Sequence, residues 1–329
     1  MKKGGRINMR KGWIILLFGI ATLLTIGVYS EPAASDYPTR SIELISPNAP
    51  GGGMDFAANL YKNKVEKILG KPMILNFKIG AAGATGTMYA KGCKPDGYSL
   101  MLASISTLVL PPLTKRGAGY TLDDFTPICT LTTTPLAFCV RVDSPYKTMP
   151  DFIRAAKTKK MRYATHGAFS TGHICMEALG KIAGFQAIHI PHTGAAAGMT
   201  AALGGHVDMA VSATTAFVGP GRLRLLAIAQ AKRLEDYPDV PTLKELGYNL
   251  PGEITYSLWA PRGTSQEIID KVYGAFQKAL EENRGEITQL AKGAEQTVLF
   301  LNGKELRKIY QADYEFYKKM IEEMGGPAK

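Results

Sequence analysis

Two glycine-rich segments have the composition expected of a backbone anion site. The first, Pro50–Gly53, precedes a predicted helix, and the second, Gly80–Gly86, occupies the same position one strand later. Because glycine has no Cβ, its backbone N–H groups can approach a ligand closely, and the first turn of a helix leaves further N–H donors unpaired. If the two segments lie side by side, we expect them to hold a carboxylate or a phosphate.

Asp55 lies in the first turn of the helix that follows the first segment. A carboxylate there stabilises the positive end of the helix, and Asp is common at this position for that reason alone. The same side chain could instead contact the ligand. The sequence leaves both interpretations open.

A second group of polar side chains surrounds Ser170. Its spacing to His173 suggests a nucleophile and a base, but Ala168 replaces the first glycine of a nucleophile elbow and no acidic partner for the histidine is apparent. Metal binding is not indicated either, because His189 and His192 flank a strand end and do not share one helical face. Ser170 is therefore interpreted as a helix N-cap or a ligand donor.

Nucleotide chemistry is not indicated. The glycines at positions 80, 83 and 86 do not follow G-x-G-x-x-G spacing, and no G-x-x-x-x-G-K-[ST] sequence occurs. The chain has two tryptophans and no cluster of aromatic and basic side chains, which argues against a nucleic-acid-binding protein. We expect neither a cofactor nor a nucleic-acid partner.

Positive charge is concentrated at the N-terminus. Five of the 39 Lys and Arg residues stand in the first eleven positions, and the other 34 face 28 acidic residues. Mostly apolar, uncharged residues 13–28 follow, with small residues before Glu31, which is the layout of a secretory signal peptide. We predict export with cleavage of residues 1–30, near Ser30. An uncleaved anchor is the alternative, but the apolar run is shorter than the ~17–25 residues that span a bilayer.

The four cysteines, Cys93, Cys129, Cys139 and Cys175, form no C-x-x-C pair. An oxidising compartment would permit a disulfide, and Cys129 and Cys139 are the nearest pair in the sequence. The alternative is that the cysteines are small buried apolar side chains.

Short apolar strands alternate with helices along the chain. The predicted strands cover 41–46, 72–77, 99–104, 136–142, 162–165, 187–191, 207–211, 225–231 and 297–301, and the predicted helices include 54–69, 149–157, 170–183 and 195–203. Two long helices begin at Thr264 and Asn302, where Glu267 and Glu305 complete capping boxes. The βαβαβ order predicts an α/β fold with parallel sheets, and two such units joined by crossover strands form a cleft.

Taken together, these motifs resemble those of the Bug (TctC-like) extracytoplasmic solute receptors, the binding proteins of tripartite tricarboxylate transporters. The resemblance follows the family's order over nearly the whole mature chain. It rests on Tyr37-Pro38, Ala49–Gly52 with Asp55, Gly80-Ala81 with Gly83 and Gly86, Pro95–Leu100, Asp124–Ile128, Tyr163–Thr165 to His173, His189–Pro191, Leu203–Asp208, Leu223–Ala227, Asp239–Thr242, and Trp259–Pro261 with Gly263-Thr264.

The resemblance implies a two-domain periplasmic-binding-protein fold of the Venus-flytrap type, with crossover strands near 136–142 and 254–261. Domain 1 would comprise 31–140 plus 255–329, and domain 2 would comprise 141–254. A first set of residues would hold one carboxylate through the backbone: Ala49, Pro50, Gly51, Gly52, Asp55, Gly80, Ala81, Ala82 and Gly83. A second set would select the rest of the ligand: Thr165, Gly167, Ser170, Thr171, His173, Thr193 and Asp208.

The site segments also depart from the family pattern. Asn48 replaces an aromatic, Ile79 and Ala82 replace a proline and a glycine, Phe169 replaces a small residue, and His192-Thr193 replace Tyr-Lys. The departures leave the carboxylate-binding segments in place but do not identify the ligand.

The expected function is that of a monomeric periplasmic receptor that carries a small carboxylate to the membrane components of a tripartite tricarboxylate-type transporter, without enzymatic activity. A receptor of the same fold that feeds a signalling sensor is the alternative. A secreted hydrolase that uses Ser170 and His173 is a third, more distant possibility.

Overall fold

The computed structural model describes residue 1 and residues 36–114, 118–192, 194–213, 217–218 and 222–326. Residues 2–30 of the predicted signal peptide and Thr193 lie outside these residues. Contacts group Pro38–Lys329 into one compact unit, and the description below concerns that unit. None of its described helices combines the length and hydropathy needed to cross a membrane.

The first of two sheets has six strands in the order β11-β4-β10-β3-β1-β2. Strand β1 pairs in parallel with β2 and β3, whereas β10 runs antiparallel to both β3 and β4. Its strands are β1 (Ile42–Ser46), β2 (Met73–Phe77), β3 (Ser99–Ala103), β4 (Phe125–Thr134), β10 (Ile254–Pro261) and β11 (Thr297–Val298). The helices of this part of the chain are α2 (Gly53–Leu69), α3 (Ala84–Lys91), α4 (Ile105–Leu108), α5 (Leu110–Thr114), α9 (Gln266–Gly293) and α10 (Gly303–Glu323).

The second sheet has five strands in the order β7-β6-β8-β5-β9. Strand β6 pairs in parallel with β7 and β8, and β5 runs antiparallel to β8 and β9. Its strands are β5 (Leu136–Arg141), β6 (Met161–Thr165), β7 (Ala187–Pro191), β8 (Met209–Ser212) and β9 (Leu223–Ala229). Helices α6 (Met149–Ala156), α7 (Thr171–Ala183) and α8 (Ala195–Leu203) belong to this part of the chain.

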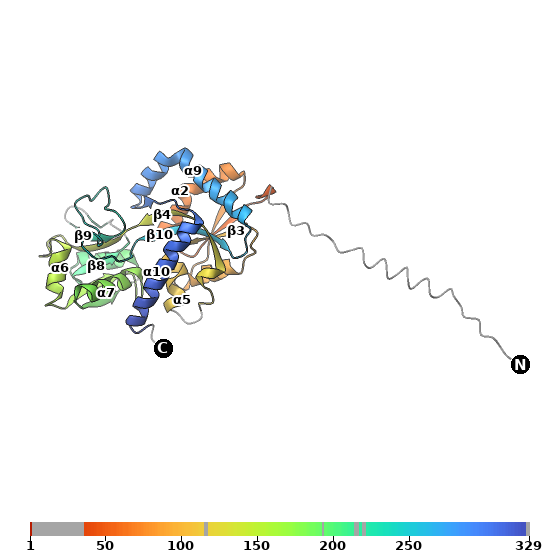
Figure 1. Ribbon diagram of the computed structural model, residues 1–329. Helices are drawn as coiled ribbons and strands as arrows, with labels where there is room; N and C mark the ends of the chain where they lie inside the picture. The colour runs from red at the N-terminus through yellow and green to blue at the C-terminus, as the bar shows by residue number, and fades with distance from the viewer. Residues whose placement is uncertain (2–35, 115–117, 193, 214–216, 219–221, 327–329) are drawn as a thin grey trace. The chain divides into compact units, whose positions relative to one another are not determined.

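The chain passes between the sheets twice. Only Pro135 separates β4 of the first sheet from β5 of the second, and the chain returns from β9 to β10. Figure 1 shows β8 and β9 with α6 and α7 at one end, and β3, β10 and α9 toward the other. The predicted α/β fold with two sheets and crossover strands is confirmed.

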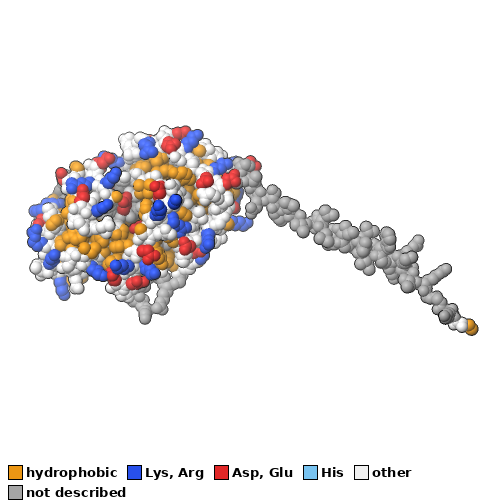
Figure 2. Space-filling model, in the orientation of Figure 1, with side chains coloured by type: hydrophobic (Ala, Val, Ile, Leu, Met, Phe, Trp, Pro, Cys, Tyr) orange, Lys and Arg blue, Asp and Glu red, His pale blue; other side chains and the backbone are white. Residues whose placement is uncertain are grey.

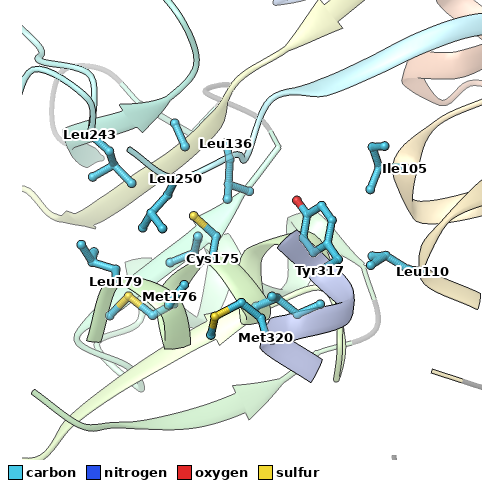
Figure 3. Close-up of a cluster of buried hydrophobic side chains, with 14 of the residues drawn as sticks. Ile105, Leu110, Leu136, Cys175, Met176, Leu179, Leu243, Leu250, Tyr317 and Met320 are labelled. Atoms are coloured by element: carbon cyan, nitrogen blue, oxygen red, sulfur yellow. The ribbon is translucent and has the colours of Figure 1, made fainter. Parts of the chain in front are cut away.

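Helix α10 packs against helices from both parts of the chain, α5 beside the first sheet and α7 beside the second. Its Tyr317 and Met320 belong to a continuous buried cluster that includes Leu110 of α5 and Cys175 of α7 (Figure 3). Near the end of α10, Glu323 forms an ion pair with Lys181 of α7 at 2.7 Å. The C-terminal helix therefore ties the elements of the first sheet to those of the second.

Several local predictions need correction. Both sheets are mixed rather than parallel, because β10 and β5 enter them in the antiparallel direction. The N-cap of α9 is Ser265, whose Oγ accepts from the Ile268 amide, while the Thr264 hydroxyl donates to the Pro261 carbonyl instead. The strand predicted over 297–301 shortens to β11, and β4 was not anticipated.

The cysteines are free, so the disulfide alternative is wrong. Cys129, Cys139 and Cys175 are buried and Cys93 is partly exposed. Cys129 and Cys139 lie on strands of different sheets. Burial raises the pKa of the Cys175 thiol to about 12, so it remains protonated and unreactive.

Candidate functional site

The first glycine segment connects β1 to α2 and is fixed by Asp55. The Asp55 carboxylate accepts a hydrogen bond from the Gly51 amide at 2.8 Å and another from the Asn59 side chain at 2.7 Å. Gly51 has a φ of +78°, a left-handed conformation that favours glycine. Asp55 therefore has the structural role, and the Gly51 amide is occupied rather than free for an anion.

Anion donors remain at the start of α2, just after Gly51. Gly52 is the N-cap, and the first-turn amides that follow it have no acceptor within the helix. Gly53 is held from the other side, since its carbonyl accepts from the Gln296 side chain at 2.8 Å. A Cβ at Gly53 would collide with the Tyr256 ring, which explains the glycine there.

The second glycine segment forms a left-handed turn between β2 and α3. Four successive residues, Gly80 to Gly83, have φ values of +144°, +49°, +57° and +91°. The two in the middle are Ala81 and Ala82, and this conformation costs a residue with a Cβ roughly 1–2 kcal/mol. Tight packing holds the turn, because a Cβ at Gly83 would lie 2.6 Å from the Thr107 side chain.

The two glycine segments lie side by side, as predicted. They follow neighbouring parallel strands, β1 and β2. A Cβ at Gly86 would lie 2.8 Å from the Cα of Pro47, so the backbones of the two connections are in direct contact. Residues 46–61 and 79–90 contain no Lys or Arg, which leaves backbone groups as the anion donors of these segments.

Thr165, at the end of β6, organises the second predicted set. Its hydroxyl lies 2.7 Å from His189 Nε2 and donates to the Gly167 carbonyl at 3.0 Å, and the Ser170 hydroxyl donates to it at 3.2 Å. Ser170 is also the N-cap of α7, because its Oγ accepts from the His173 amide at 3.3 Å. The structure thus brings Thr165, Gly167, Ser170 and His173 together.

His173 stacks on His189, with ring centroids 3.8 Å apart and planes 12° apart. Burial lowers the pKa of each to about 4, so both rings are neutral near pH 7. The Phe169 amide donates to His173 Nδ1 at 2.9 Å, which makes that nitrogen an acceptor. Ser170 meets the backbone of His173 and not its ring, so the geometry offers no general base to activate the serine.

Asp208 does not belong to this group. Its carboxylate accepts from the Arg162 amide at 2.8 Å, at the amino ends of β6 and β8. Ser170 and Thr165 lie beyond the carboxyl ends, and the length of β8 separates the two levels by about 13 Å. The family resemblance implied Asp208 as a site residue, but the direction of β8 puts it at the opposite end of that strand.

Two buried hydroxyls near the same edge have no hydrogen-bond partner within the described residues, Thr171 Oγ1 and Ser212 Oγ. A Cβ at Gly172 would lie 2.8 Å from the Val211 carbonyl, so the start of α7 packs directly on the end of β8. Ser212 and His189 were missed as site residues. The only sequence signal was a polar residue at the end of an apolar strand.

No metal site accompanies these residues: among the positions that the structure describes, no three His, Cys, Asp or Glu side chains are grouped to hold an ion. Two cavities of the described residues lie elsewhere. One of about 640 Å³ lies beside α6 and α7, and one of about 460 Å³ lies between residues 230–237 and the end of α9.

Comparison with known proteins gives a consistent result. The family model described as tripartite tricarboxylate transporter family receptor matches residues 58–326. A UPF0065 protein in the gbd 5' region of Cupriavidus necator is 36% identical over 282 residues, which cover 83% of this chain and 86% of that protein. BugT of Bordetella pertussis is 26% identical over 331 residues, covering 98% of this chain and all of BugT.

Solved structures agree in fold. A TctC solute-binding protein from Polaromonas, without ligand, has 31% identity and a TM-score of 0.77 over 87% of this chain and 99% of its own. MatC of Rhodopseudomonas palustris with bound malate has 23% identity and a TM-score of 0.71, over 87% of this chain and 100% of its own. A second R. palustris protein, with adipate, has 23% identity and a TM-score of 0.76, over 89% and 100%.

Proposed function

The chain belongs to the tripartite tricarboxylate transporter receptor family, and from that premise we propose that it binds a small organic carboxylate and delivers it to the membrane components of such a transporter. It is a solute-binding receptor and not an enzyme. The proposed ligand class includes the malate and adipate present in two structural neighbours. The protein would act as a periplasmic monomer after cleavage near Ser30.

One observation carries the ligand class. The two glycine segments meet at the carboxyl ends of β1 and β2, where they offer backbone donors without any Lys or Arg. Such a site favours a compact anion that several N–H groups can approach together. A carboxylate fits these donors and leaves the rest of the ligand to face another part of the protein.

The second set would select that remaining part. Thr165, Ser170 and the neutral His173 offer hydroxyl and imidazole groups without net charge at pH 7. Thr171 already belongs to this set, and we add Ser212, because the buried hydroxyls of both have no hydrogen-bond partner among the described residues. Thr193 remains part of the proposal from the family resemblance, and Asp208 does not.

The domains proposed are 31–140 plus 255–329 and 141–254, hinged where the chain passes between the sheets. This division is supported by the two sheets and by the single residue, Pro135, between β4 and β5. Ligand would bind between the domains.

Mass spectrometry of small molecules released from natively purified protein tests the function. We expect an organic acid in amounts stoichiometric with the protein. Protein carrying Gly52→Val, purified in parallel, should release much less of the same compound. Recovery of a neutral or cationic solute, retained equally by both proteins, would contradict the proposal.

A further inference from the structure

The cavity beside α6 and α7 is strongly basic. It has a volume of about 640 Å³ and lies where the C-terminal ends of both helices meet the start of β7. Its lining includes four lysines, Lys157, Lys159, Lys160 and Lys181, and a single acidic residue, Glu177. Figure 2 shows blue Lys and Arg side chains along the end of the molecule that contains α6.

The charges in this cavity are not balanced. Lys181 is paired with Glu323, and the Glu177 carboxylate accepts a hydrogen bond from the Tyr163 hydroxyl. Lys157, Lys159 and Lys160 are exposed, and none of the three forms an ion pair with any residue that the structure describes. Three positive charges therefore face the cavity without a partner.

Helix stability does not explain these three lysines. A cation near the C-terminus of a helix interacts favourably with the helix dipole, but the effect falls off beyond the last turn. Helices α6 and α7 already have Arg154 and Lys181 in their last turns. Lys159 and Lys160 lie outside α6, beyond its C-cap Lys157.

The neighbouring strand adds a second feature. Gln186 lines the cavity directly before β7, which is one of the two edge strands of the five-stranded sheet. An edge strand has backbone N–H and C=O groups available to an added extended segment. Two large apolar side chains close by in the chain, Ile182 and Ile188, are 59% and 46% exposed.

We propose that this cavity is the docking site for an extended acidic segment of a partner protein. Carboxylates of the segment would enter between Lys157, Lys159 and Lys160, while its backbone lies along β7. The strand edge beside the lysines favours a polypeptide over a membrane, because only a polypeptide can pair its backbone with β7. The inference goes beyond solute binding and does not depend on which solute the protein carries.

A labelled peptide tests the proposal on the full mature chain. Fluorescence polarisation would measure binding of fluorescein-labelled hexaglutamate, with labelled hexaglutamine as the uncharged comparison. The triple variant Lys157→Glu, Lys159→Glu, Lys160→Glu should weaken hexaglutamate binding at least about tenfold. The matched control is Lys278→Glu, Lys304→Glu, Lys308→Glu, three exposed positions on α9 and α10 with the same change in net charge. It should change the affinity by less than about twofold.

Three outcomes would overturn the proposal. Equal losses in both triple variants would mean that the overall charge, and not the cavity, attracts the peptide. Equal binding of hexaglutamate and hexaglutamine by the unmodified protein would mean that the lysines select no acidic segment. Binding of phosphatidylglycerol vesicles that the first triple variant abolishes, with hexaglutamate binding unchanged, would assign the lysines to a lipid surface. Thermal unfolding of each variant verifies that it is folded.

Discussion

The amide of Gly51 donates to Asp55, so the proposed anion site of the first glycine segment begins one residue later. Gly52 has φ −89° and ψ 172°, which any residue can adopt, and its nearest atom to an added Cβ is the Ala49 carbonyl oxygen at 3.5 Å. A side chain therefore fits the fold at Gly52. It would occupy the space in front of the first-turn amides, where the proposed carboxylate lies.

Gly52→Val should consequently weaken every carboxylate ligand, because the branched side chain blocks the approach to the backbone donors. The loss should be at least about tenfold, or ~1.4 kcal/mol of binding free energy. Valine is a poorer N-cap than glycine, which costs stability on the order of 1 kcal/mol or less. Calorimetry with mono- and dicarboxylates provides the measurement. Gly274→Val, in open space on α9, is the control, and unchanged affinity in Gly52→Val would exclude the backbone site.

Ser212 of β8 and Ser257 of β10 are both buried serines on strands, so the effects of replacing them can be compared. Ser212 Oγ has no hydrogen-bond partner within the described chain, whereas Ser257 Oγ contacts Trp259 Nε1 and the Tyr310 hydroxyl, each at 2.8 Å. Ser257→Ala leaves buried partners unsatisfied and should cost about 1–3 kcal/mol of unfolding free energy. Ser212→Ala should leave the stability of the ligand-free protein unchanged or increase it. Urea unfolding compares the two, and a similar loss in both would show that Ser212 is satisfied.

Asp313 of α10 makes the folding stability of the protein depend on pH. Burial, and secondarily the nearby Glu253 carboxylate, raises the pKa of Asp313 to about 7. In the unfolded chain the same group titrates near pH 4, so the folded protein binds this proton more tightly. The stability that protonated Asp313 provides is therefore complete below about pH 4 and is lost as the pH rises through about 7.

Asp313→Asn should flatten this dependence, since asparagine is uncharged at every pH. Urea unfolding should show the variant more stable than the unmodified protein at about pH 8, with the advantage shrinking toward about pH 4. Glu315→Gln, at an exposed position of the same helix, serves as the comparison. Parallel pH curves for the Asp313 variant and the unmodified protein would refute the assignment.

At the scale of elements, sequence periodicity predicted those helices and strands whose formation depends on residues close together in the chain. Helix α8 lies where it was predicted, and the Asn302 capping box forms as expected. Strand β4 was not predicted because five of its ten residues are threonines, so this largely buried strand lacks a continuous apolar run in the sequence. The hydrogen-bond partners of these threonines lie far away in the sequence, since Thr130 donates to the Leu299 carbonyl and Thr132 donates to the Gln296 side chain.

The candidate site likewise has a part that the sequence predicts and a part that it does not. The glycine segments were predictable because glycine before a helix has a local physical meaning. The contact of Thr165 with His189, and the position of Asp208 at the opposite end of the sheet, depend on the order and direction of β6, β7 and β8. No pattern within one segment encodes that order, so the residue types alone could not separate Ser212 from Asp208.

At the scale of the whole molecule, the two crossings between sheets should act as a hinge. Pro135 and the connection from β9 to β10 are the covalent links there, with α10 packed across them. Addition of a tight ligand should reduce the radius of gyration in small-angle X-ray scattering, because closure buries the ligand between the domains. Gly52→Val with the same ligand should show no compaction. A scattering curve unchanged by a ligand of confirmed affinity would count against a hinge.

The lack of Lys and Arg in both glycine segments has a consequence for ionic strength. A site made of amide dipoles has no formal charge to screen, so its affinity for a carboxylate should respond little to added sodium chloride. Contacts between exposed lysines and an acidic polypeptide weaken steeply under the same conditions. A salt titration of the same protein would therefore distinguish binding of the solute from docking of the partner. At raised ionic strength, the receptor would keep its solute bound while it dissociates from its partner.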